Sequence, residues 1–185
     1  MTSGVQVPKR TLGKTNIEIT PIGLGMMEFS GGGGLMGAVF PTIDQEEKNA
    51  AVKAGLDGGI NWFDTAELYG AGVSEASLST ALKAAGKSDH EVVVATKWWP
   101  FLRTARNISR TIEDRLRFLN GYSIGLYMVH QPFSFSSVEA EIGGSWKDPF
   151  GGHQQFQSKS NAQGTSSVAE GWFAAGGKPG ALQFA

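Results

Sequence analysis

Side chains that can exchange protons follow several short apolar runs in the sequence. Asp64, Lys97 and His130 each stand directly after such a run, and Tyr69 lies five residues beyond Asp64. If these runs are parallel strands joined by helices, their carboxyl ends lie on one side of the sheet, where ligands bind in such folds. The four groups would then meet there, and neighbouring titratable groups shift each other's pKa, as catalytic sites require. We therefore predict a catalytic site built from a carboxylate, an ammonium, an imidazole and a phenol.

Each of these residues also has a structural explanation when it is considered alone. An aspartate after a strand often caps the next turn, and a lysine is usually solvated. A tyrosine often packs, and a single histidine is more often a hydrogen-bonded structural residue than a catalyst. The convergence of all four on one end of a sheet favours the catalytic interpretation.

The elements that would position these residues alternate between strand and helix. The expected strands are almost continuously apolar, as strands covered on both faces are, and span 60–63, 92–96 and 124–129. The expected helices have apolar residues three and four positions apart. Three helices are expected, from Asp44 to Gly58, from Ser74 to Gly86, and from Ile108 to Asn120-Gly121, where residues typical of helix ends occur. This alternation predicts right-handed parallel units, as in a doubly wound sheet or an α/β barrel.

Three features precede this alternation. Residues 9–20 contain a turn at Gly13 and predict a small hairpin, and residues 21–27 predict a brief strand. Four consecutive glycines follow at 31–34. A phosphate-binding loop would open a helix and end in Lys-Ser or Lys-Thr, which this segment does not do, so a mobile loop is favoured.

The composition limits the class of protein. A chain of 185 residues has room for one domain, and its formal charge of −1 argues against a nucleic-acid surface. The absence of cysteine excludes disulfides and thiolate sites, and no apolar run approaches a membrane span. We expect a cytoplasmic protein that contacts neither nucleic acid nor membrane. His90 and His153 have no metal-like partners in the sequence, so no metal is assigned.

Several motifs resemble those of the aldo-keto reductases, in the family's order over residues 9–141. In chain order they are Arg10–Gly13, Ile22–Gly25, Phe63–Gly70 with Gly72 and Ser74-Glu75, Ala95–Lys97, and Val129–Pro132. The resemblance implies an α/β fold, namely the N-terminal half of a (β/α)8 TIM barrel with a short N-terminal β-hairpin. It also implies an NADPH-dependent oxidoreductase that reduces an aldehyde or ketone to an alcohol. A doubly wound nucleotide-binding domain is the weaker alternative, because no Gly-x-Gly-x-x-Gly joins a first strand to a helix.

By this resemblance Tyr69 is the proton donor, Asp64 and Lys97 tune it, and His130 orients or polarises the carbonyl. Hydride addition builds negative charge on the carbonyl oxygen, so a proton donor must lie within hydrogen-bond reach. A free tyrosine has a pKa of about 10, and we expect the nearby ammonium of Lys97 to lower it. Asp64 would hold that ammonium charged and in place.

The resemblance also places cofactor contacts at Gly25, Met26 and Asp64. Candidate walls of a substrate pocket are apolar and lie close to the same motifs, although core packing explains them equally well. They are Trp98, Trp99, Phe101 and the pair Met26-Met27.

The domain boundaries follow the same patterns. Residues 1–20 form an N-terminal arm and hairpin, 21–141 form half a barrel of four β/α units, and 142–185 form an irregular tail. The tail contains nine glycines, only three Leu, Ile or Val residues, and no strand or helix periodicity. Half a barrel leaves sheet edges unpaired, including that of the strand at 124–129, so self-association through an open edge is expected.

A slipped reading frame would explain the tail. When the codons after residue 146 are read one base later, they permit GKIRSVGISNF and, further on, LPLAANQV. Both resemble stretches of the same family, in the family's order. We therefore expect a slip close to Glu141 and a truncated reductase whose activity is in doubt. The alternative function is a catalytically inactive half-barrel fragment or binding remnant.

Overall fold

The structure is a computed structural model that describes residues 7–13, 15–32, 40–130 and 172–174. Its strands are β1 (Arg10–Thr11), β2 (Glu18–Ile19), β3 (Leu24–Gly25), β4 (Trp62–Asp64), β5 (Val93–Trp98), β6 (Leu126–Val129) and β7 (Trp172–Ala174). Its α-helices are α2 (Gln45–Asp57), α3 (Val73–Ala84) and α4 (Ile108–Leu119). Short 3₁₀ helices are η1 (Met27–Ser30), η2 (Gly70–Gly72), η3 (Asp89–Glu91) and η4 (Ala105–Asn107).

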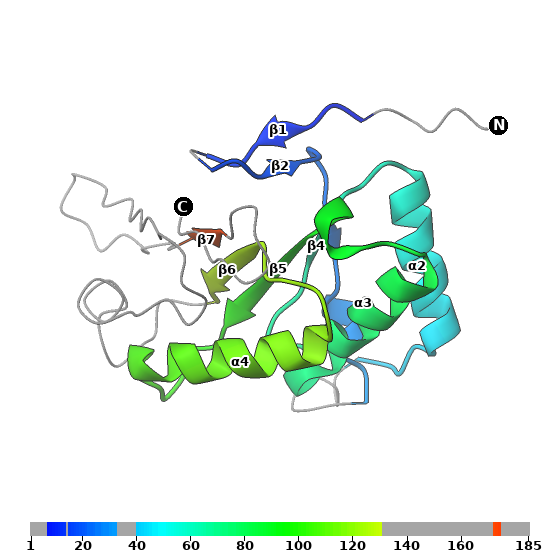
Figure 1. Ribbon diagram of the computed structural model, residues 1–185. Helices are drawn as coiled ribbons and strands as arrows, with labels where there is room; N and C mark the ends of the chain where they lie inside the picture. Colours follow the sequence, from blue (N-terminus) through cyan, green and yellow to red (C-terminus); the bar gives the residue numbers. More distant parts are fainter. Residues whose placement is uncertain (1–6, 14, 33–39, 131–171, 175–185) are drawn as a thin grey trace.

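Strands β3 to β6 form a parallel sheet in the order in which they occur in the chain. Helices α2, α3 and α4 lie on one side of this sheet, and the hairpin of β1 and β2 lies on the other (Figure 1). Neighbouring parallel strands joined by helices on one face are the repeating unit of a β/α barrel. The predicted alternation of strands and helices is therefore confirmed for the described residues.

The helices begin and end for local reasons. The Asp44 side chain accepts a hydrogen bond from the Glu47 N–H at 2.8 Å, as predicted from its position before α2. Helix α4 ends at Asn120 in the left-handed conformation, with φ of 44°. The expectation that Ser74 caps α3 is wrong: Gly72 is the N-cap, with φ of 109°. Ser74 lies inside the helix, where its hydroxyl makes longer-range contacts.

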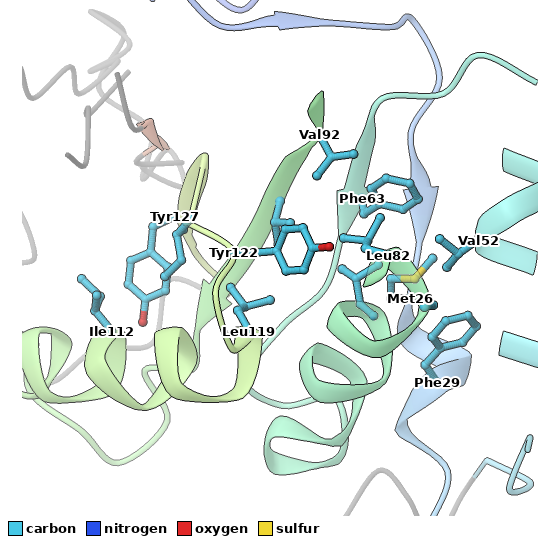
Figure 2. Packing of buried hydrophobic residues seen from close by; sticks show 14 of the residues in the cluster. Met26, Phe29, Val52, Phe63, Leu82, Val92, Ile112, Leu119, Tyr122 and Tyr127 are labelled. Atoms are coloured by element: carbon cyan, nitrogen blue, oxygen red, sulfur yellow. The ribbon is translucent and has the colours of Figure 1, made fainter. Parts of the chain in front are cut away.

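The main core lies between the sheet and the three helices. Figure 2 shows aromatic and aliphatic side chains from both layers in contact, and the fully buried ones include Phe63, Leu82, Leu119 and Tyr127. The segment expected as a strand over 21–27 is shorter than predicted. It turns into η1 after β3, which buries Phe29 in this core.

Uncharged groups join the hairpin to the sheet at the amino end of β4. The Asn61 Oδ1 accepts from the Thr20 N–H at 2.8 Å, and the Asn61 Nδ2 donates to the Glu18 carbonyl at 2.8 Å. The Trp62 indole N–H donates to the Thr20 carbonyl at 3.0 Å. A second apolar cluster, around Ile17, packs beneath these bonds.

The free side of β6 is paired in the structure. Strand β7 lies antiparallel to it, with Met128 opposite Trp172 and Leu126 opposite Ala174. Residues 172–174 of the segment expected to be an irregular tail therefore form a short strand along this edge. The rest of the predicted tail lies outside the described residues. None of the helices described is long and apolar enough to cross a membrane.

Candidate active site

Strands β4, β5 and β6 deliver three of the four predicted residues to the same end of the sheet. Asp64 is the last residue of β4, Lys97 is next to last in β5, and His130 directly follows β6. The parallel register pairs Asp64 with Ala95 and Lys97 with Met128, so Lys97 and then His130 each lie two residues further along than the group on the preceding strand. The topology predicted from the sequence is the reason why these side chains meet.

The closest contact in the site is an ion pair. The Lys97 ammonium donates to Asp64 Oδ1 at 2.7 Å and to Oδ2 at 2.8 Å, and to the Thr65 carbonyl at 2.9 Å. The lysine side chain is 14% exposed and the aspartate 30%, so the pair is shielded from much of the solvent. An ammonium has three N–H donors, and these three bonds account for all of them.

Tyr69 is brought to this pair by the turn between β4 and η2. Its ring lies against the Lys97 ammonium, with 5.1 Å between Nζ and the ring centroid. The His130 ring meets it edge-on, with 5.6 Å between the centroids and an interplanar angle of 89°. The four predicted groups therefore lie together, with the phenol ring next to both the amine and the imidazole.

The direction predicted for the Tyr69 pKa is wrong. Burial of the phenol raises the pKa above its ordinary value, and the negative charges of Asp64 and Glu28 raise it further. The charge of Lys97, which is paired with Asp64, does not reverse this effect. The phenol therefore stays protonated at neutral pH.

His130 is held at the end of β6 by its backbone N–H, which donates to the Trp98 carbonyl at 2.9 Å. Burial lowers the pKa of its imidazole, and the Lys97 charge lowers it further, against a smaller opposing effect of Asp64. The ring is therefore neutral near pH 7. Its buried Nδ1 has no hydrogen-bond partner among the described residues.

The two further residues expected at the cofactor lie at the end of β3, next to Asp64. Gly25 pairs with Asp64 in the sheet and is exposed, and a Cβ built on it meets no atom within 4 Å. The Met26 N–H donates to the Asp64 carbonyl at 2.8 Å. The Met26 side chain, however, is 1% exposed and belongs to the main core, so only its backbone faces this part of the site.

The candidate pocket walls also include both buried core residues and residues that face the site. Trp98 is fully buried in the core. Trp99 is half-buried, and its ring stacks on that of Phe101 with 5.6 Å between centroids and an interplanar angle of 16°. Trp99 and Phe101 therefore form an aromatic surface directly beyond the end of β5, which we call the aromatic wall.

The turn that carries Tyr69 is fixed by contacts that the sequence did not reveal. The Ser74 hydroxyl donates to the Met26 carbonyl at 2.7 Å and accepts from the Thr65 hydroxyl at 2.9 Å, so it ties α3 to the ends of β3 and β4. Gly72 has φ of 109°, and a Cβ there would lie 2.5 Å from the Phe118 ring. The glycine and serine of the signature motif therefore shape the turn.

The sequence also did not reveal a buried ion pair on the side of β5 that faces the helices. Arg115 Nη1 donates to Glu75 Oε2 at 3.0 Å, and the Thr96 hydroxyl donates to Glu75 Oε1 at 2.8 Å. Burial raises the pKa of Glu75 to about 7, against the opposing charge of Arg115. The carboxylate joins α3, α4 and β5 on the side of the sheet away from the proton-exchanging groups.

Metal ligation has no support among the residues described. No three His, Asp or Glu side chains gather within those segments. His90 is exposed in η3, beside Ser88, and His153 lies outside the described residues.

The fold and the arrangement of these side chains together define a class of proteins built on parallel β/α barrel units. The family model of the Aldo/keto reductase family matches residues 21–143, and the chain belongs to this family. The chain is 34% identical over 137 residues to the aldo-keto reductase YhdN of Bacillus subtilis, covering 70% of this chain and 39% of that protein. It is 28% identical over 138 residues to the L-galactose dehydrogenase of Arabidopsis thaliana, covering 72% of this chain and 41% of that protein.

Solved structures of the same family have the same fold. A thermostable aldo-keto reductase in complex with the inhibitor epalrestat aligns with a TM-score of 0.61 at 27% identity, over 74% of this chain and 47% of that one. The holo form of aldo-keto reductase AKR11C1 from Bacillus halodurans aligns with a TM-score of 0.51 at 27% identity, over 66% of this chain and 39% of that one. The predicted fold, part of a (β/α)8 barrel, is therefore confirmed. The chain spans 39% and 41% of the length of the two sequence relatives.

Proposed function

We propose that this site reduces an aldehyde or ketone to an alcohol, with NADPH as the cofactor and Tyr69 as the proton donor. The observation that supports this most strongly is the proximity of the Tyr69 ring to both the Lys97 ammonium and the His130 imidazole. The resemblance of the motifs to the family supports NADPH, and a related solved structure is a holo form. The cytoplasmic location expected from the cysteine-free composition is part of the same proposal.

The end of β3 fits a bound cofactor. Gly25 is exposed and has open space where a side chain would stand, so another molecule can approach the backbone closely. Gly25 and Asp64 would hold NADPH, and the backbone of Met26 would add only van der Waals contact, because its N–H and carbonyl are bonded to Asp64 and Ser74. NADPH supplies the hydride when it is bound.

The protein's own residues handle the proton. The neutral Tyr69 phenol donates its proton to the carbonyl oxygen as negative charge develops there. The Lys97 ammonium, held by Asp64, stabilises the phenolate that remains. His130, which is neutral, lies against the phenol edge, where it orients the carbonyl. The raised pKa of Tyr69 keeps the acid form available at neutral pH.

We also propose that the residues after Glu141 arise from a slipped reading frame, which leaves the 185-residue chain inactive and prone to self-association. The two stretches that the shifted codons permit support this proposal. Resequencing the DNA around the Glu141 codon tests it. An intact frame in independent clones would end the idea.

The test of function compares the 185-residue chain with a chain whose frame is restored after Glu141. NADPH binding is followed by the fluorescence of the five tryptophans, and turnover by NADPH oxidation with a panel of aldehydes. We expect the restored chain to bind NADPH and reduce an aldehyde. Binding without turnover in both chains would favour the inactive remnant, and neither binding nor turnover in the restored chain would contradict the proposed function.

A further inference from the structure

Glu67 joins the turn that carries Tyr69 to the segment that follows β5. Its backbone N–H donates to the Lys97 carbonyl at 3.1 Å. Its carboxylate accepts from the Trp99 backbone N–H at 3.0 Å through Oε2, and from Arg103 Nη1 at 2.6 Å through Oε1. We call these contacts of Glu67 with Lys97, Trp99 and Arg103 the Glu67 bridge.

The burial of Glu67 makes the bridge strong. The carboxylate side chain is 11% exposed, and a carboxylate removed from water is costly unless its oxygens are paired. Arg103 is 31% exposed, so the pair is screened less than a surface ion pair. Charge-assisted hydrogen bonds to both oxygens fix the direction of the side chain as well as its position.

The segment held by the bridge exposes apolar groups. Phe101 is 52% exposed and Leu102 is 68% exposed, and Leu102 adopts a left-handed φ of 57°. Neither feature stabilises the loop by itself, because exposed apolar groups gain no burial and a left-handed φ is unfavourable for leucine. Arg103 therefore anchors the far end of this loop, while Trp99 begins it.

We propose that Glu67 is a positioning residue that sets the aromatic wall, Trp99 and Phe101, at a fixed place relative to Tyr69. Tyr69 stands two residues after Glu67 in the same turn, and the Glu67 backbone N–H binds the Lys97 carbonyl. The Glu67 carboxylate therefore joins the turn that carries Tyr69 to the start of the wall at Trp99. A carbonyl compound lying on the wall then presents its oxygen to the phenol. The kinetic part of this inference rests on the proposed function, whereas the structural part does not.

Limited chymotrypsin digestion of the folded 185-residue chain tests the structural part. Cleavage after Phe101 or Leu102 is followed by mass spectrometry in the parent, Glu67→Ala, Arg103→Met and Arg103→Lys. We expect about tenfold faster cleavage in the first two variants, because a charge-assisted hydrogen bond is lost, and near-parental cleavage in Arg103→Lys.

A matched control is Asp89→Asn, which removes a carboxylate bonded to Ser123 before the start of β6, at the far end of the sheet. It should lower the melting temperature without a selective increase in cleavage after Phe101 or Leu102. Equal cleavage of this loop in the parent, Glu67→Ala and Arg103→Met would overturn the proposal, whether or not any form of the protein turns over.

The kinetic part is tested in the frame-restored chain with benzaldehyde and propionaldehyde. We expect Arg103→Met to raise KM for benzaldehyde about tenfold while kcat changes little, because the wall moves and the proton donor does not. Propionaldehyde, which has little surface to lie on the wall, should be nearly unaffected. An equal loss with both substrates would assign Arg103 a general structural role and overturn the positioning role of the bridge.

Discussion

The two ends of the parallel sheet are closed by different kinds of contact. At the amino end, Asn61, Thr20 and Trp62 bind the hairpin through neutral hydrogen bonds above an apolar cluster. At the carboxyl end, charged Asp64 and Lys97 lie beneath a phenol ring in a turn shaped by glycines. In β/α barrels the first arrangement serves stability and the second serves chemistry. Substitutions at the carboxyl end should therefore lower turnover, whereas substitutions at the amino end should lower the stability of the fold.

The largest effect is expected for Tyr69→Phe in the frame-restored chain. Removing the phenol hydroxyl removes the proton donor, and general acid catalysis contributes about 10²–10⁴-fold. We expect turnover to fall by this factor while the tryptophan-monitored affinity for NADPH changes little. An equal loss of turnover and of affinity would place Tyr69 in cofactor binding and weaken the comparison.

A smaller loss of turnover is expected for Lys97→Met. The variant leaves the phenol in place but removes the charge that stabilises the phenolate, and one preorganised electrostatic contact contributes about 10²-fold. Initial rates at saturating NADPH measure the effect. A variant with parental rates would show that the ion pair with Asp64 is only structural.

At the amino end, Asn61→Ala should change stability and not chemistry. It removes a buried amide that accepts from Thr20 and donates to Glu18, and leaves their backbone groups unpaired, at a cost of about 1–3 kcal/mol. Urea unfolding measures the loss, and kcat of the frame-restored chain should be unchanged. A fall in kcat larger than the fall in folded fraction would contradict the separation of the two ends.

The smallest effect concerns pH and His130. The pKa of this imidazole is lower in the folded state than in the unfolded state, so the unfolded chain binds more protons just below pH 6.5. Its contribution to stability is therefore present above that pH and is lost as the pH falls through the folded value. Melting temperatures at pH 7.5 and 5.5 should differ less in His130→Asn than in the parent. An identical difference in both would show that His130 does not titrate in this way.

The sequence predicted what depends on topology and missed what depends on loop geometry. Asp64, Lys97 and His130 could be placed together because the carboxyl ends of neighbouring parallel strands lie at the same side of the sheet. The direction of the Tyr69 pKa shift could not be predicted, because it depends on the burial of the phenol and on the nearby charges of Asp64 and Glu28. Glu67 had no assigned role, although it stands inside the signature motif, because its partner Arg103 is 36 residues away in the chain.

Small shifts in element boundaries account for the other differences. Ser74 has the residue type of an N-cap, but the left-handed φ of Gly72 starts the helix earlier and leaves the hydroxyl free to bind Met26. The core stripe of α3 did not depend on this boundary, because the spacing of Leu78 and Leu82 determines which face is buried.

The central claim is that Tyr69 and Lys97 act as one proton-donating unit. A double-mutant cycle in the frame-restored chain tests it most directly, with kcat measured for Tyr69→Phe, Lys97→Met and the combination. If the lysine acts through the phenol, the double variant should be no slower than Tyr69→Phe alone, because groups that act as a unit are not additive. Losses that multiply in the double variant would contradict the account.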